Sequence, residues 1–300
     1  MDTITHTLFG LSLYGAVDKR SMSRKEKQAL LFATVAGSQI PDIDVISAWW
    51  DSAGRYQMWH RGLTHSVLLV PLWGALLAGL SRWLWKTTGL FWFGIASLAV
   101  FIHDTSDLFN AWGTGYLEPL SSVRITFGTI PIVDLVFWLA MLAALLASRL
   151  VPRFRAAPHR AFRIAWLIMA LHVGIQSAQG YALYKQAVAD YDQVALSADF
   201  VPGRFTVVGK QGDLVELNRA SVWSGFEPVA QLTSREDADL EPLFAANPRA
   251  RTLVEWSPFV VVVSDGERLG VFDPRFYRNG ESFLYEFIET GAVSDEGSCR

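Results

Sequence analysis

Long apolar stretches dominate the first 184 residues of the chain. Four of them carry few or no charged residues: Ser66–Ser81, Thr87–Ile102, Thr126–Ser148, which only Asp134 interrupts, and Ile164–Tyr184. The last stretch has 21 residues without Asp, Glu, Lys or Arg, and a helix needs about 20 residues to cross the roughly 30 Å hydrocarbon layer of a bilayer. The pattern therefore predicts four membrane-spanning helices.

Two shorter apolar segments precede these stretches, at about Ile4–Val17 and Gln28–Ile40. Each has only about 13 or 14 residues, which leaves open a short span, a re-entrant piece or a buried helix. We expect both to be embedded in the membrane, which makes about six membrane-embedded helices. The start of the chain carries Asp2 and His6 and no basic region, so a cleavable signal peptide is not expected.

The hydrophobic period changes to that of β-strands in the last third of the chain. Two pairs of apolar runs flank glycine turns: Phe205–Val208 with Leu214–Leu217 around Gly212, and Pro258–Val263 with Leu269–Phe272 around Gly266. A glycine beside a polar residue supplies the positive φ of a tight turn, so both pairs read as β-hairpins. We predict an α-helical polytopic membrane domain over residues 1–184 and a small β-rich extramembrane domain over residues 190–300.

Charge divides the chain at the same place. Residues 1–184 have a net charge of +5 and residues 185–300 a net charge of −8, which sum to the −3 of the whole chain. The acidic tail, and the lack of a basic face interleaved with aromatic residues, argue against a nucleic acid as the substrate.

The Lys and Arg residues of the first part also predict an orientation. With six crossings, twelve of them fall in loops on one side: Lys19, Arg20, Arg24, Lys25, Lys27, Arg82, Lys86, Arg149, Arg153, Arg155, Arg160 and Arg163. The opposite loops hold three, Arg55, Arg61 and Arg124. Because cytoplasmic loops are enriched in Lys and Arg, we expect both termini and the acidic domain outside the cytoplasm.

Ionisable residues in or beside membrane helices are costly to place there, which makes them candidates for function. They gather in Asp2–His6, Pro41–Asp44, His60–Ser66 and His103–Thr114, followed by Asp134. In the expected topology each group lies at the outward end of its segment. His103 and Asp107 are four residues apart, so they share a helix face and can hold one ion or one hydrogen bond. Imidazole and carboxylate are ligands of zinc and of other first-row divalent metals.

These residues resemble the YdjM-like inner-membrane proteins, which are described as metal-dependent hydrolases. The shared blocks are M-D-x-x-T-H, P-D-[IL]-D, H-R-G-x-T-H-S, H-x-x-x-D-x-x-N-x-x-G-T and a later Asp in an apolar run. The chain carries them at Met1–His6, Pro41–Asp44, His60–Ser66, His103–Thr114 and Asp134, so the resemblance covers about residues 1–150. The wider kinship of the family is a remote one, to zinc phospholipase C and the P1-type nucleases, which cleave phosphate esters.

The resemblance implies a site for one to three divalent metal ions, zinc foremost. Its implied ligands are His6, Asp42, Asp44, His60, His65, His103, Asp107 and Asp134. Arg61 suits an anionic substrate oxygen because its guanidinium is a planar fork of donors, and Arg61 and Asp104 are the candidate catalytic residues.

Other roles stay open for several of these residues. Asp42 could cap the turn after Pro41, and Arg61 could bind a lipid phosphate or pair with Asp44. Asp104 lies about 100° around the helix from His103, which favours exposure to solvent. Asp134 could partner a metal or Arg124. His172 lies in the last apolar stretch, where we expect an interhelical hydrogen bond.

We therefore expect a membrane-bound, metal-dependent hydrolase in the bacterial inner membrane, with its site on the extracytoplasmic side. Its substrate would be a phosphate ester or a phospholipid-like molecule that approaches from membrane lipid and is attacked by a metal-activated water. No G-x-S-x-G block is present to suggest a serine nucleophile. The alternative is a metal-stabilised membrane scaffold or signalling partner that binds another envelope protein through residues 190–300.

Overall fold

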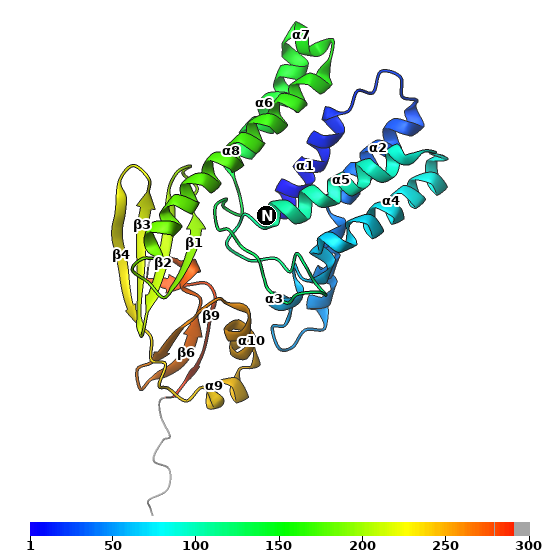
Figure 1. Cartoon of the computed structure of the whole chain (residues 1–300). Helices are drawn as coiled ribbons and strands as arrows, with labels where there is room; N and C mark the ends of the chain where they lie inside the picture. Colours follow the sequence, from blue (N-terminus) through cyan, green and yellow to red (C-terminus); the bar gives the residue numbers. More distant parts are fainter. Residues whose placement is uncertain (279, 291–300) are drawn as a thin grey trace, which may run out of the picture. The chain divides into compact units, whose positions relative to one another are not determined.

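The chain divides into two compact units, and the computed structural model describes residues 1–278 and 280–290 of it (Figure 1). The first unit comprises Met1–Ile46, Trp59–Ala182 and Ser197–Phe205, and the second comprises Ser47–Met58, Leu183–Leu196 and the chain from Thr206 onward. A short segment from the helical part of the sequence, Ser47–Met58, therefore belongs to the second unit.

The first unit begins with a bundle of four helices and a 3-10 segment. They are α1 (Thr3–Ala16), α2 (Arg24–Gly37), η1 (Ile40–Trp49), α4 (Val70–Trp85) and α5 (Leu90–Asp107). The Asp2 carboxylate caps α1 by accepting from the backbone N–H groups of Ile4 and Thr5. A capping box formed by Ser23 and Glu26 starts α2.

Small residues let these helices approach closely. A Cβ placed on Gly37 would lie 2.7 Å from the Cβ of Ala99, so α2 and α5 touch at this point. A Cβ placed on Gly74 would lie 2.0 Å from the Oγ of Ser97, so α4 and α5 also touch. Close backbone approach through small residues is the usual packing of helices in membranes, and here it holds the C-terminal end of α5 against the segment that follows α2.

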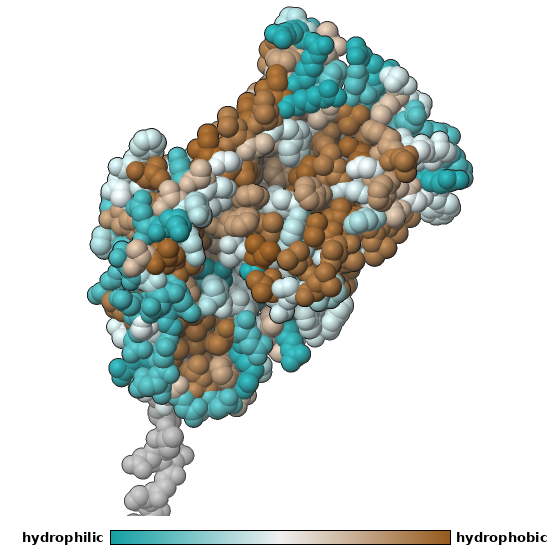
Figure 2. Space-filling model, viewed as in Figure 1, coloured by the Kyte–Doolittle hydropathy of each residue, from teal (hydrophilic) through white to brown (hydrophobic). Residues whose placement is uncertain are grey.

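Short turns and three further helices complete the helical part of the chain. The turns between η1 and α4 are α3 (Tyr56–Trp59), most of which belongs to the second unit, η2 (Leu63–His65) and η3 (Val67–Leu69). The helices α6 (Leu135–Leu150), α7 (Pro152–Arg155) and α8 (Pro158–Ala187) follow α5. Figure 2 shows apolar side chains over much of the visible surface of the helices, with hydrophilic side chains at the end where α6 meets α7.

Two helices are long and apolar enough to cross a membrane, the run Val67–Trp85 and α8. A third span results if α2 and η1, which are bent by 52° at their junction, are taken together. The expected short helices near Ile4–Val17 and Gln28–Ile40 are present as α1 and α2, each of 14 residues. The expected total of six membrane helices is not confirmed.

The span expected over Thr126–Ser148 is wrong in its first part. The helix α6 begins at Leu135 and has 16 residues, and residues 126–134 are not helical. Asp134 explains this start, because its carboxylate accepts from the backbone N–H of Phe137 and so caps the helix.

The second part of the chain is β-rich, as predicted. One sheet has the order β1 (Gln193–Ala198), β2 (Phe205–Gln211), β3 (Leu214–Ser221) and β4 (Gly225–Thr233), and another has β5 (Val261–Ser264), β6 (Arg268–Phe272) and β9 (Tyr285–Glu289). The short strands β7 (Tyr277–Arg278) and β8 (Glu281–Ser282) pair with each other, and α9 (Glu241–Ala246) and α10 (Pro248–Trp256) precede β5.

Both predicted hairpins are confirmed. Strands β2 and β3 are neighbours across a turn in which Gly212 has φ +56°, and β5 and β6 pair antiparallel across a turn in which Gly266 has φ +86°. Side chains of both hairpins, among them Val208, Leu217 and Phe272, form one core.

Candidate metal centre

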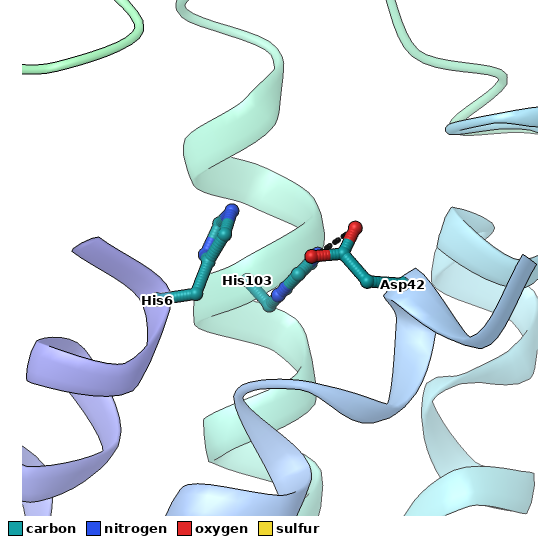
Figure 3. A group of neighbouring side chains, drawn as sticks. All are labelled: His6, Asp42 and His103. Atoms are coloured by element: carbon teal, nitrogen blue, oxygen red, sulfur yellow. Dashed lines mark ion pairs between the residues drawn. The ribbon is translucent and has the colours of Figure 1, made fainter. Parts of the chain in front are cut away.

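Imidazoles and carboxylates from four separate segments of the first unit converge at one end of its helices. His6 comes from α1, Asp42 and Asp44 from η1, His60 and His65 from the segment before α4, and His103 and Asp107 from α5. They form three overlapping groups whose ligand atoms lie within 4.8 Å of one another: His6, Asp42 and His103; His65, His103 and Asp107; and Asp42, Asp44 and His60. Figure 3 shows how the members of the first group point toward one another from three elements.

His103 is fixed in the orientation that a metal ligand needs. Its Nδ1 lies 2.8 Å from the carbonyl oxygen of Ser38, which can only accept, so Nδ1 carries the proton. The Nε2 atom therefore presents its lone pair, 3.1 Å from Nε2 of His65 and 3.6 Å from Oδ1 of Asp42. A carbonyl that fixes the tautomer in this way is typical of metal-binding histidines.

His65 is oriented by its neighbours in the same manner. The hydroxyl of Thr64 donates to Oδ2 of Asp44 at 2.9 Å, so Nδ1 of His65 can donate to the Thr64 oxygen at 3.1 Å. This places the lone pair of His65 on Nε2, which lies 3.2 Å from Oδ1 of Asp42. Burial lowers the pKa of His65 to about 3, although the nearby Asp42 carboxylate acts in the opposite direction, so the ring is neutral at ordinary pH.

These contacts fit a cation. The Nε2 atoms of His65 and His103 face each other at 3.1 Å beside a carboxylate oxygen, so with the tautomers given above a cation between them would be held by all three atoms. The ring of His6 stacks on His103 with centroids 3.7 Å apart, and its two nitrogens have no hydrogen-bond partner within the described part of the chain. Imidazoles and carboxylates buried together in this way are the donor set of zinc and related ions.

The guanidinium of Arg61 places a buried positive charge next to Asp107 of this cluster. Its Nε lies 3.0 Å from Oδ2 of Asp107, and its two terminal nitrogens donate to Oδ1 of Asn110 at 2.8 Å and to the Met1 carbonyl at 3.0 Å. The α-amino group of Met1 also contacts Asp107. The guanidinium is thus buried against Asp107, which it holds in place next to the histidines.

The backbone of Arg61 is also unusual, because its φ of +59° lies in the left-handed region. A residue other than glycine costs on the order of 1–3 kcal/mol there and persists only when its surroundings demand it. Two hydrogen bonds hold the backbone of Arg61 in this conformation. Asp44 accepts from the backbone N–H of Arg61 at 3.0 Å, and the N–H of Gly115 donates to the Arg61 carbonyl at 2.6 Å.

The cluster is accessible at one edge. His103, His65 and Asp107 are fully buried, but the side chains of His60 and Asp42 are 18% and 20% exposed. At that edge Nδ1 of His60 lies 3.0 Å from Oδ1 of Asp44, so the carboxylate orients the imidazole. The cluster is therefore partly exposed at this edge, mainly through His60 and Asp42.

Asp134 does not join the cluster. Besides capping α6, its Oδ2 lies 2.9 Å from Nε2 of His172 in α8, and it belongs to none of the three groups of candidate ligands. Its alternative partner, Arg124, instead donates to the carbonyls of His60 and Gly113. The interhelical hydrogen bond expected of His172 is confirmed.

Asp104 is buried, and the expectation that it faces solvent is wrong. Because α5 packs against α2 on one side and α4 on the other, the face 100° from His103 is covered as well. Neither carboxylate oxygen of Asp104 has a hydrogen-bond partner among residues 1–278 and 280–290. The residue is not in any of the candidate ligand groups.

Three residues that support the cluster were not assigned a role from the sequence. Thr64 and Asn110 lie within the recognised blocks, so their position beside histidines and aspartates was the available signal. Ser38 acts through its backbone carbonyl, for which a sequence carries no side-chain signal. Asp2, the second residue of the first block, is explained as the cap of α1.

The first unit thus defines a class: an apolar helical protein with a buried cluster of histidine and aspartate at one end of its helices. Residues 1–183 match the family described as YdjM inner membrane protein, and the chain belongs to this family, as the sequence blocks predicted. The uncharacterized protein YfhP of Bacillus subtilis (strain 168) is 32% identical over 159 residues, or 48% of this chain and 45% of YfhP. The chain therefore matches less than half the length of this curated relative. No solved structure matches the chain.

Proposed function

We propose that the chain is a metal-dependent membrane hydrolase that acts on a phosphate ester carried by a membrane lipid. The observation that carries the proposal is the convergence of two lone-pair nitrogens, those of His65 and His103, on the Asp42 carboxylate, beside an accessible edge. The residues that would hold the ion are His6, Asp42, Asp44, His60, His65, His103 and Asp107. A bound divalent ion supplies Lewis acidity, which activates water and stabilises charge on phosphoryl oxygens.

The residues at the accessible edge have distinct tasks in this proposal. Asp44 orients His60 through the 3.0 Å contact at Nδ1, which would align both residues as ligands at the exposed edge of the cluster. Arg61, bound to Asp107 and Asn110, acts as a positioning residue that neutralises the carboxylate and keeps it aligned. We assign Asp104 no role in the reaction.

The positions of the basic residues support a proposed orientation of the site. The basic residues 19–27, 82–86 and 149–163 lie at the C-terminal ends of α1, α4 and α6 and in the segments that follow them. The cluster lies at the N-terminal end of α1 and the C-terminal end of α5, which is the opposite end of the helices. Since Lys and Arg favour the cytoplasmic side, we place the cluster on the extracytoplasmic side of the inner membrane.

Hydrolysis is tested with purified full-length protein in detergent. The protein is stripped with a chelator and reloaded with Zn²⁺, and phosphate release is measured from a monoacylglycerol phosphate. We expect activity only after reloading, and a loss of at least about 100-fold in His103→Ala, since even residues that support metal ligands contribute 10–100-fold. The matched control is His159→Ala, because His159 contacts Asp18 rather than the cluster.

Two outcomes would contradict the proposal. One is a His103→Ala variant as active as the wild type. The other is a fully loaded wild-type protein that releases no phosphate, which would favour a metal-stabilised scaffold.

A further inference from the structure

An open apolar pocket lies beside the candidate metal centre in the first unit. Its volume is about 180 Å³, and α1, α5, α6 and α8 contribute to its walls, which include the rings of Phe9, Phe109 and Phe137. This is less than the roughly 300–1,000 Å³ of pockets that enclose whole small molecules, so the pocket suits a section of a narrow chain whose remainder lies outside it.

The pocket and the metal centre share two helices. On α5, the candidate ligands His103 and Asp107 occupy one face, while Ile102 and Ser106 line the pocket from the neighbouring stripe at i and i+4. Phe109 lines the pocket from the turn that follows the helix. On α1, the ring of Phe9 in the pocket wall packs edge-on against the ring of His6, with centroids 6.2 Å apart. The ring of Phe9 therefore lies between the pocket and His6 of the cluster.

The lining of the pocket selects for hydrocarbon. Its two hydroxyls are already paired, because Ser106 donates to the His103 carbonyl at 2.9 Å and Thr105 shares a 3.0 Å hydrogen bond with the hydroxyl of Tyr116. The remaining walls are aliphatic and aromatic, and they include the indole N–H of Trp166, which has no hydrogen-bond partner within residues 1–278 and 280–290. A polar ligand would lose its hydrogen bonds to water there and regain few of them.

The pocket is open on the surface that meets lipid. It runs along α8, one of the two helices able to span a membrane, and its lining includes Phe101, which is 42% exposed, and the exposed Ala170. In a bilayer, the material available to such an opening is the acyl chains of lipids.

We propose that this pocket binds one acyl chain of the lipid whose phosphate ester is presented to the His/Asp cluster. The proposal rests on the proposed function and adds to it the substrate class: a lipid phosphate with at least one acyl chain, in place of a water-soluble phosphate ester. Seating the chain beside Phe9 and Ile102 would bring the headgroup to the ends of α1 and α5, which is the end of the helices at which the cluster lies.

The test is photolabelling of the full-length protein in phosphatidylcholine vesicles. The probe is a monoacylglycerol phosphate with a diazirine on its acyl chain, titrated over a range of mole fractions, and labelled peptides are mapped by mass spectrometry. We expect saturable labelling of the segments 102–109 and 169–173. In Val173→Phe, which places a ring in the pocket, labelling at subsaturating probe should fall about tenfold.

The matched control is Leu171→Phe on the same helix, because Leu171 is 62% exposed and does not line the pocket. It should label as the wild type does. Should Val173→Phe fail to give folded protein by circular dichroism and gel filtration, Ala170→Phe at the rim replaces it. Labelling that rises in proportion to the probe fraction without saturation, and is equal in the pocket variant and the control, would overturn the proposal.

Labelling does not require turnover, so the two proposals fail separately. Saturable pocket labelling without phosphate release would refute hydrolysis and support the acyl-chain site. Phosphate release from the same probe with no labelling of the pocket would refute the acyl-chain site and support hydrolysis.

Discussion

Replacing Asp134 by Ala tests whether this residue is a structural tie or a metal ligand. In the structure it caps α6 and binds His172 of α8, apart from the cluster. We therefore expect Asp134→Ala to lower the stability of the protein and to leave its metal content unchanged.

The size of the effect follows from the two contacts that are lost. Removing an N-cap carboxylate costs about 0.5–2 kcal/mol, and a hydrogen bond to a charged group contributes about 1.5–3 kcal/mol. Together they predict that the free energy of unfolding falls by about 2–5 kcal/mol. Asp134→Asn keeps one oxygen, which can still accept from the Phe137 N–H, but places an NH2 group where Oδ2 contacts His172, so its loss should be smaller than that of Asp134→Ala.

The assay is unfolding in detergent micelles, combined with metal analysis of the same samples. A double-mutant cycle of Asp134→Ala with His172→Ala should show a coupling energy of about 0.5–3 kcal/mol, as for residues in direct contact. Additive effects of the two changes, or a loss of bound metal in Asp134→Ala, would refute the assignment.

Two further predictions concern helix packing and pH. Gly37→Ala should lower the free energy of unfolding by about 1–3 kcal/mol, because its Cβ would overlap Ala99. The control Gly79→Ala, with open space around it, should change stability by less than about 1 kcal/mol. Equal effects of the two changes in thermal unfolding would count against the α2–α5 contact. In chelator-treated protein, His65 stays neutral when folded, since its pKa lies near 3 instead of 6.5. The unfolded state then binds more protons than the folded state below pH 6.5. As the pH is lowered from 6.5, the free energy of unfolding should therefore decrease by up to about 1.4 kcal/mol per pH unit. His65→Gln should flatten this slope, and an unchanged slope would contradict the reasoning.

The approach of the histidines and aspartates to one another could be predicted from the sequence because each lies at an end of a helix. His6 begins α1, Asp42 follows α2 and His103 ends α5, so helices that alternate in direction bring these residues to one side. The hairpins around Gly212 and Gly266 could be predicted as well, because tight turns need the positive φ that glycine adopts.

Other features depend on tertiary packing and carry no local signal. Asp104 stands at the end of an apolar stretch, with Val100 and Phe101 one turn earlier on α5, but the sequence does not show what covers that side of the helix. The contacts of α5 with α2 and α4 and the burial of Asp104 show it. Asp134 reads as a charge within an apolar run, but the helix begins at that point and turns the charge into a cap. The left-handed φ of Arg61 results from contacts with residues distant in sequence.

The central claim, that the cluster binds a metal ion, is tested most directly by X-ray absorption and elemental analysis of the purified full-length protein. We expect bound zinc or a related ion with nitrogen ligands at about 2.0–2.1 Å, as imidazole coordination gives. The ion should be lost from a variant that combines His65→Ala and His103→Ala and retained in His159→Ala. A double variant that keeps its full complement of metal, with an unchanged absorption spectrum, would contradict the claim.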